Sequence, residues 1–88
     1  MPRFYFHVLD DLDTDDPEGA ELADIDEARG RAVTAARVLM CETLTQEGRI
    51  TLHHRIDIED DQGDRTESVY FRDVVRIETE PDGVEPPN

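Results

Sequence analysis

The stretch that decides the fold runs from Asp24 to Gly48 and has the sequence DIDEARGRAVTAARVLMCETLTQEG. Asp24 is a good N-cap residue, and Glu27 follows three positions later, as in a capping box. Acidic side chains in the first turn suit the positive end of the helix dipole, and glycine is a common helix stop. The sequence therefore predicts one long helix that begins after Asp24 and ends at Gly48.

One side of this predicted helix is apolar. At about 100° per residue, seven positions form one continuous stripe: Ile25, Ala28, Ala32, Ala35, Ala36, Leu39 and Thr43. Such a stripe is typical of a helix that lies on a sheet, and the alanines indicate a close approach. A second apolar line beside it, made of Val33, Met40 and Leu44, faces either a partner chain or only the loops. On the polar side, Asp26 and Arg29 are spaced as an i,i+3 ion pair.

The segment before the helix predicts a strand and a short return strand. Residues 3–9 are rich in aromatic and β-branched types, and their side chains alternate between two faces. Phe4, Phe6 and Val8 form the purely apolar face, which we assign to the core, while Tyr5, His7 and Leu9 share the other. The acidic run at 10–17 contains a proline and is predicted to be a loop. Residues 19–22 then form a short strand that pairs back on the first.

Two further strands are predicted after the helix. Ile56 and Ile58 share one face with His54, whereas Arg55, Asp57 and Glu59 share the other with His53. A turn follows at 60–64, where Gly63 supplies the positive φ that short hairpin loops require. On the last strand Val69 and Phe71 point inward and Tyr70 and Arg72 outward, and Val74, Val75 and Ile77 continue the apolar signal. From Thr79 to Asn88 the chain is acidic and proline-rich, which predicts a disordered tail.

This order of elements predicts an α+β fold. One helix packs on one face of a small antiparallel sheet of three to four strands, in the order β-β-α-β-β, within a single domain at 1–78. The opposite sheet face is left open. If the strands are neighbours, that face carries Tyr5, His7, Arg55, Asp57, Tyr70 and Arg72.

Composition excludes several classes of function. The 88-residue chain carries 23 acidic and 9 basic residues, a formal net charge of −14, and every basic residue is arginine. This field repels phosphate backbones, so nucleic-acid binding is not expected unless the arginines gather on one face. Cys41 is the single cysteine, and no stretch approaches the length of a membrane span or a signal peptide, so we expect a reduced cytoplasmic protein.

Several segments together resemble a known family. They are the opening at 1–8, the segment at 18–24 before the helix, the alanine stripe from Glu27 to Ala36, Ile58-Glu59-Asp60 with Gly63, and the segment at 69–75. In combination they resemble a family of short proteobacterial domains catalogued as domain of unknown function 6894, over nearly the whole chain up to about Ile77. The resemblance implies that the chain is complete as a domain, and it implies no activity.

Candidate cation and catalytic sites are weak in this sequence. Asp11, Asp13 and Asp15 match the first ligand positions of an EF-hand loop, but Asp16 stands where its glycine belongs and Leu22 where its glutamate belongs. We therefore interpret the run as a solvated acidic loop, with a weak cation site as the alternative.

Transition-metal binding and covalent catalysis are also not expected. His53 and His54 are neighbours on a predicted strand and point to opposite faces, so they do not easily bind one ion together, and His7 adds only a ligand on the open face. Cys41 lies late in the helix and away from the core stripe, where nothing lowers the pKa of a thiol. The sequence thus predicts no enzyme, no cofactor and no metal.

The open sheet face is the best candidate for function. Tyrosine and arginine are enriched at binding hot spots, and a thin core favours self-association. The leading hypothesis is a non-enzymatic module that self-associates or binds a protein through this face. The alternative is that the face is an ordinary outer surface with cross-strand ion pairs. A rival is a regulator that acts through its charge, by binding a basic partner or by mimicking nucleic-acid phosphates.

Overall fold

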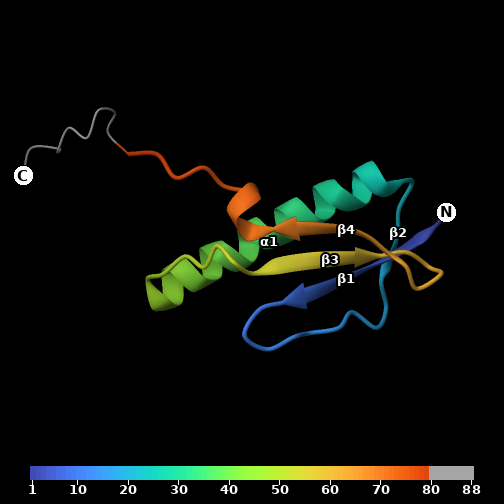
Figure 1. The fold of residues 1–88 in the computed structure, drawn as a ribbon, viewed down its shortest axis with the longest axis horizontal. Coiled ribbons are helices and arrows are strands. Elements are labelled where there is room, and N and C mark those ends of the chain that lie inside the picture. The colour runs from blue at the N-terminus through green and yellow to red at the C-terminus, as the bar shows by residue number, and fades with distance from the viewer. Residues whose placement is uncertain (80–88) are drawn as a thin grey trace, which may run out of the picture.

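The computed structural model describes residues 1–79 of the chain. The elements follow one another as β1 (Arg3–Leu9), β2 (Ala20–Glu21), α1 (Ile25–Glu47), β3 (Arg55–Glu59), β4 (Arg65–Tyr70) and a short 3₁₀ helix, η1 (Phe71–Asp73) (Figure 1). This confirms the predicted α+β fold and its order of elements. All but the first residue of the predicted tail at 79–88 lies outside the described residues.

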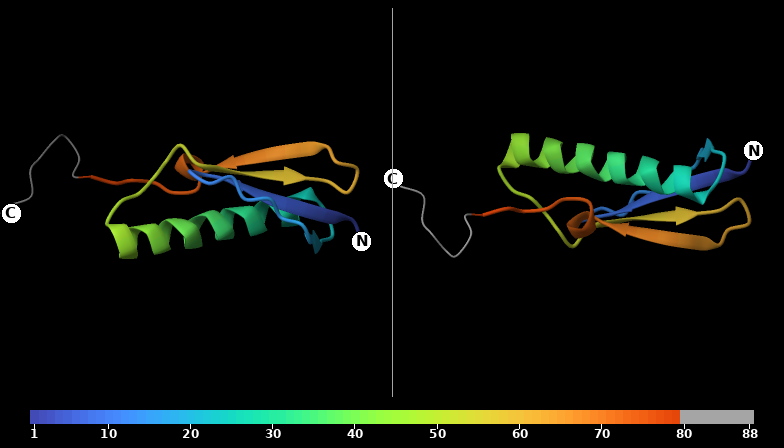
Figure 2. Two further views of the ribbon diagram at one scale, coloured as in Figure 1. Left: turned by 90° about the horizontal axis from the view of Figure 1, so that it is seen from below. Right: turned by 90° about the horizontal axis from the view of Figure 1, so that it is seen from above.

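The four strands form one antiparallel sheet in the order β2-β1-β3-β4. The register sets Phe6 opposite Ile58 and Ile56 opposite Val69, so the apolar sides of the three longer strands share one face. Helix α1 covers that face as a second layer, which is clear when the molecule is viewed from the side (Figure 2). The other face has no helix over it among residues 1–79.

Helix α1 begins and ends where its capping residues predict. A carboxylate oxygen of Asp24 accepts a hydrogen bond of 2.9 Å from the backbone N–H of Glu27. At the other end Gly48 has a φ of 70°, and its backbone N–H donates to the carbonyl of Leu44 at 3.0 Å. Both caps satisfy backbone groups that a helix end would otherwise leave without a partner.

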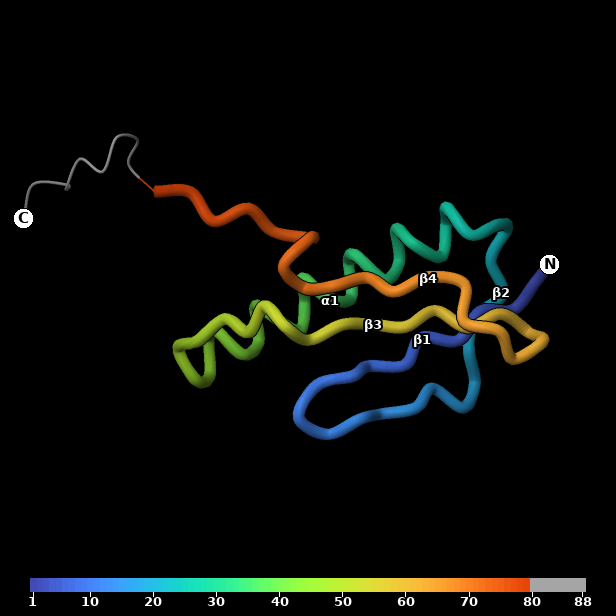
Figure 3. The backbone as a smooth tube through the Cα atoms, in the orientation of Figure 1, coloured from blue at the N-terminus to red at the C-terminus, as the bar shows by residue number. Residues whose placement is uncertain are grey.

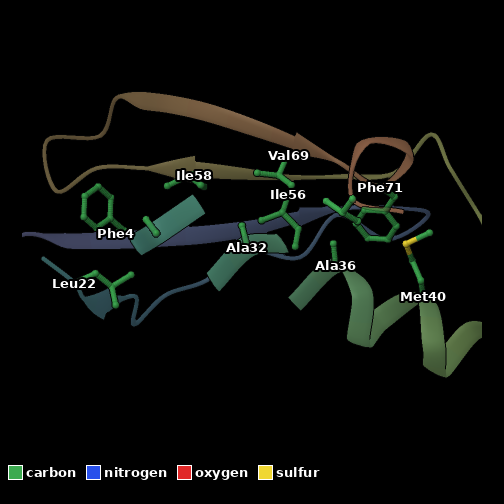
Figure 4. Close-up of a cluster of buried hydrophobic side chains, with 11 residues drawn as sticks. Phe4, Leu22, Ala32, Ala36, Met40, Ile56, Ile58, Val69 and Phe71 are labelled. Carbon is green, nitrogen blue, oxygen red and sulfur yellow. The ribbon is translucent and has the colours of Figure 1, made fainter. Parts of the chain in front are cut away.

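The buried side of α1 differs in one respect from the predicted stripe. Ala28, Ala32 and Ala36 are fully buried, and the next residue in the same i,i+4 row is Met40, which is 6% exposed. Met40 therefore belongs to the core, whereas the sequence placed it in a second line with Val33 and Leu44 (Figure 4). Three alanines in a row let the helix backbone approach the sheet closely, and Met40 fills the wider space beyond them.

The hydrophobic core lies between α1 and the sheet. Its buried members are Phe4, Leu22, Ala28, Ala32, Ala36, Met40, Ile56, Ile58, Val69, Phe71 and Val74. The predicted alternation of β1 is confirmed, because Phe4 is buried there and Phe6 and Val8 pack against it. Tyr5 and Tyr70 remain half-buried and lie on the other side of the sheet.

Two strand boundaries were predicted wrongly. β3 begins at Arg55, so His53 and His54 precede the strand instead of alternating within it. β4 ends at Tyr70, and Phe71 enters the core from η1. Beyond the ladder these segments still pair, because the backbone N–H of Phe71 donates to the carbonyl of His54 at 2.9 Å.

The acidic loop, residues 10–19, follows the outer edge of β1. Backbone bonds of 2.9 and 2.8 Å join Val8 and Thr14 in both directions. Farther along, a carboxylate oxygen of Asp16 accepts a hydrogen bond of 3.2 Å from the backbone N–H of Phe6. The side chain of Asp16 thus takes the place of a neighbouring strand at this point of the edge.

Helix α1 is much longer than the sheet that it covers. Its 23 residues span about 34 Å, whereas the five residues of β3 span about 17 Å. The C-terminal part of α1 therefore extends past the strands, and residues 48–54 cross back from it to β3 (Figures 1 and 3). No helix among residues 1–79 is long and apolar enough to cross a membrane.

Candidate functional site

The predicted interface residues come together on the open sheet face, with one exception. Cross-strand pairing sets His7 opposite Asp57 and Arg55 opposite Tyr70, and Tyr5 lies farther along β1 opposite Glu59. Arg72 lies in η1, beyond the end of the strand. Its guanidinium carbon nevertheless lies 4.7 Å from the centre of the Tyr70 ring, and that of Arg55 lies 5.9 Å from it.

Asp57 is the centre of a polar network on this face. It is only 7% exposed, and its carboxylate accepts hydrogen bonds from the hydroxyl of Ser68 at 2.6 Å, from Nε of Arg55 at 3.0 Å and from Nη1 of Arg65 at 3.1 Å. Burial opposes the ionisation of this carboxyl, but the three hydrogen bonds outweigh it and lower the pKa of Asp57. The hydrogen bond between Arg55 and Asp57 also raises the pKa of the Arg55 guanidinium. The centre of the open face is therefore closed by its own ion pairs.

The β1 side of the open face is tied to the acidic loop. The backbone N–H of Asp16 donates to Nδ1 of His7 at 3.1 Å, and a Cβ placed on Gly19 would lie 2.9 Å from the Tyr5 ring. Burial opposes ionisation of the Asp16 carboxyl, but hydrogen bonds from the backbone N–H groups of Gly19, Phe6 and Glu18 prevail and lower its pKa. The side chains of His7 and Tyr5 are thus in contact with the acidic loop of the same chain.

The Asp57 network makes stability depend on pH. Because the pKa of Asp57 is lowered on folding, its contribution is complete above the unfolded value of about 4 and is lost as the pH falls through the lower folded value. We expect Asp57→Asn to reduce the free energy of unfolding by about 1–2 kcal/mol at neutral pH, and by less at about pH 3. Urea denaturation at both pH values measures this.

The matched control for that prediction is Asp61→Asn, which removes the same charge from the exposed 60–64 turn. It should change stability by less than about 0.5 kcal/mol. An Asp57→Asn cost that persisted unchanged at low pH would show that the carboxylate charge contributes nothing to the network.

A second surface lies at the overhanging end of α1. Arg37, Met40, Cys41, Leu44, Ile50 and Val75 line a hollow of about 300 Å³, which we call the helix-end groove. Leu44 is 49% exposed and Ile50 is 41% exposed. Nε of Arg37 donates to the carbonyl of Val74 at 2.9 Å and so fixes the segment after η1 beside the helix. Of its lining residues, Met40 and Leu44 had a signal in the sequence, through the second apolar line.

A third feature lies on the other flank of α1, where the chain brings two histidines to one aspartate. Asp11, His53 and His54 each offer one ligand atom, and these atoms all lie within 4.8 Å of one another. His53 and His54 meet in this way because they precede β3, so the alternation assumed for a strand does not apply to them. His7 lies on the open face instead, where its Nδ1 is 3.6 Å from a carboxylate oxygen of Asp15. Asp11 and Asp15 of the EF-hand-like run thus lie close to different histidines.

The family comparison agrees with these features of the chain. The model of a family described as domain of unknown function 6894 matches residues 3–72, which include all four strands and α1. The chain matches no curated protein and no solved structure. From β1 to η1 this chain is therefore a member of the domain of unknown function 6894 family.

Proposed function

We propose that this domain is a non-enzymatic interaction module that binds a second copy of itself through the helix-end groove. The observation that carries the proposal is the groove itself, where two half-exposed aliphatic side chains, Leu44 and Ile50, flank a hollow lined almost wholly by apolar atoms. Apolar surface gathered at one place is typical of a docking site. A chain of 88 residues has a thin core, so burying this surface in a dimer also adds stability.

The distribution of charge favours a second copy at this groove. Ten acidic residues and no basic residue lie between Asp10 and Glu27, whereas five arginines and only two acidic residues lie between Ala28 and Ile56. The groove has one arginine and no carboxylate among its lining residues. Two copies that meet here bring together surfaces without a carboxylate in the lining, which reduces the repulsion between the −14 fields.

The open sheet face supports docking less well than the groove. Asp57 already accepts hydrogen bonds from three donors, and Tyr70 lies against two arginine side chains. Docking a partner there would have to displace or cover these interactions without offering better ones. We therefore move the proposed interface from this face to the helix-end groove.

The ionisable groups support a non-enzymatic function. Two carboxyls among residues 1–79 have shifted pKa values, Asp16 and Asp57, and both are shifted downward and engaged by hydrogen-bond donors. A general acid or base at neutral pH needs the opposite shift, toward the operating pH. These carboxylates fit structural roles in the acidic loop and on the open face.

The decisive experiment is sedimentation equilibrium with two variants of α1. We expect the wild-type chain to dimerise, and more strongly at high salt, because salt screens the repulsion between like-charged copies while leaving apolar contacts intact. Leu44→Glu should weaken the dimer by roughly thirtyfold, the loss of one hot spot. Val38→Glu is the matched control, since Val38 is 51% exposed on the same helix but outside the groove, and it should leave the dimer unchanged.

Two outcomes would refute this proposal. A wild-type chain that stays monomeric at high concentration and high salt has no such interface. A dimer that resists Leu44→Glu but dissociates with Tyr70→Ala uses the open sheet face instead.

A second candidate, a regulator that binds a basic partner, is supported by the acidic loop. Asp11, Asp13 and Asp15 are exposed within a run without any basic residue, so the loop presents a concentrated negative field. Such binding would weaken steeply as salt rises, the reverse of the dependence expected for the dimer. The sign of the salt dependence therefore separates the two candidates.

A further inference from the structure

The side-chain cluster of Asp11, His53 and His54 is built by the pairing of β1 with β3. Leu9 at the end of β1 lies opposite Arg55 at the start of β3, so the residues just beyond each end meet. The turn after β1 and the segment before β3 can be followed side by side in Figure 3. Asp11 therefore reaches the two histidines across the 41 residues that separate it from His53, in a position that the sheet fixes.

His54 is largely buried in this cluster, and one of its ring nitrogens has no hydrogen-bond partner among residues 1–79. Its side chain is 12% exposed, and its ring packs edge-on against Phe71 with the ring centres 5.7 Å apart. Nε2 is buried and has no hydrogen-bond partner among residues 1–79. A carboxylate oxygen of Asp11 lies 3.5 Å from Nε2, longer than an ordinary N–H···O hydrogen bond. A buried nitrogen without a partner is rare in folded proteins and points to a missing ligand.

The geometry points to a metal ion, and we propose that Asp11, His53 and His54 bind a divalent transition-metal ion of the zinc type. Two imidazole nitrogens and one carboxylate oxygen are a common donor set for zinc. Ligand atoms about 2.1 Å from a tetrahedral ion lie about 3.4 Å from one another. The separation of 3.5 Å between His54 and Asp11 already matches this value, and the 4.8 Å limit on the whole set requires only a small movement of exposed side chains.

The surroundings suit a cation and leave room for a fourth ligand. A cavity of about 170 Å³ adjoins His54, and Asp10 and Asp11 line it. A water molecule or the carboxylate of Asp10 can complete the coordination there. Arg49 also lines the cavity, but its charge is compensated by Glu47, whose carboxylate lies 2.8 Å away. The acidic loop further raises the local concentration of cations. The bound ion would fasten this loop to the start of β3.

Zinc titration of the full chain by calorimetry tests the proposal. We expect one ion per chain at micromolar zinc. Asp11→Asn and His53→Gln should each weaken binding by roughly tenfold or more, and both positions are exposed, so neither variant should impair folding. Asp13→Asn is the matched control, because it removes the same charge from the same loop, and it should change affinity by less than about threefold. His7→Gln should also leave zinc binding intact.

Imidazole nitrogen shifts in NMR spectra provide a second measurement. They should move on zinc addition at His53 and His54 and not at His7. The proposal is overturned if the wild-type chain shows no saturable binding below millimolar zinc, or if Asp13→Asn weakens binding as much as Asp11→Asn, since only the field of the loop would then be at work. Neither result bears on the dimer, whose groove lies on the opposite flank of α1.

Discussion

Replacing Ile56 with alanine is expected to lower the free energy of unfolding by about 2–5 kcal/mol. Ile56 is fully buried in β3, between α1 on one side and the paired residues Val8 and Val69 in the neighbouring strands. Close packing against a helix backbone leaves the surroundings little freedom to collapse into the cavity. A domain of this size has a total stability of only about 4–13 kcal/mol, so the variant approaches the threshold of unfolding. Urea denaturation measures the loss.

A graded substitution at the same site checks the cause. Ile56→Val removes a single methylene and should cost about 0.5–1.5 kcal/mol. If Ile56→Ala and Ile56→Val lowered the free energy of unfolding by equal and small amounts, the centre of the sheet would not be packed against α1 as described.

Replacing Gly19 with alanine should cost about 2–3 kcal/mol. Gly19 has a φ of 68°, a conformation that residues with a Cβ rarely adopt. A Cβ there would lie 2.6 Å from the backbone carbonyl oxygen of Phe4, so either β2 or the acidic loop must move. We expect the thermal midpoint to fall and the protection of the Phe6 amide against hydrogen exchange to decrease.

Two other glycines separate the causes of this effect. Gly48 shares the positive φ but has open space around its Cβ position, so Gly48→Ala reports the conformational strain alone, about 1 kcal/mol. Gly30 lies inside α1 with open space around it, so Gly30→Ala should stabilise the protein by about 0.5–1 kcal/mol. If Gly19→Ala costs no more than Gly48→Ala, the contact with Phe4 is unimportant.

The helix and the two faces of the sheet were predictable because their signals are local. Asp24, Glu27 and Gly48 define the ends of α1 through neighbours in the sequence. Met40 was misplaced because the prediction assumed a stripe at a constant angle. The contact instead follows the i,i+4 row from Ala28, which drifts around the helix when it crosses its neighbour at an angle.

Contacts between distant segments were not predictable in the same way. Arg29 pairs with Asp26 as its spacing predicts, but it also donates from Nη2 to a carboxylate oxygen of Glu67 at 2.9 Å, which depends on where β4 lies. Ser68 reaches Asp57 as its direct cross-strand partner, whereas Arg65 reaches it from beyond a register shift between Ile58 and Glu59. Alternation alone does not reveal such an irregularity.

The three candidate surfaces differ in how far the sequence foretold them. The open sheet face follows from alternation, so most of its residues were named correctly. The helix-end groove needs Ile50 and Val75, whose positions beside α1 depend on the path of two connecting segments. The cluster of Asp11 with the two histidines requires β1 and β3 to be neighbours, which the order of strands decides and the sequence left open.

The Asp16 carboxylate has a consequence for solubility in acid. Because the carboxylate accepts a hydrogen bond from the backbone N–H of Phe6, this position on the edge of β1 offers no free donor to a strand of another molecule. Protonation of the Asp16 carboxylate in acid would weaken that acceptor. Acidification thus frees the backbone N–H of Phe6 at the edge of β1 for pairing with another molecule, and β1 is rich in aromatic side chains. Because the pKa of Asp16 is lowered, the edge of β1 becomes free only at a lower pH than an aspartate with an ordinary pKa would allow.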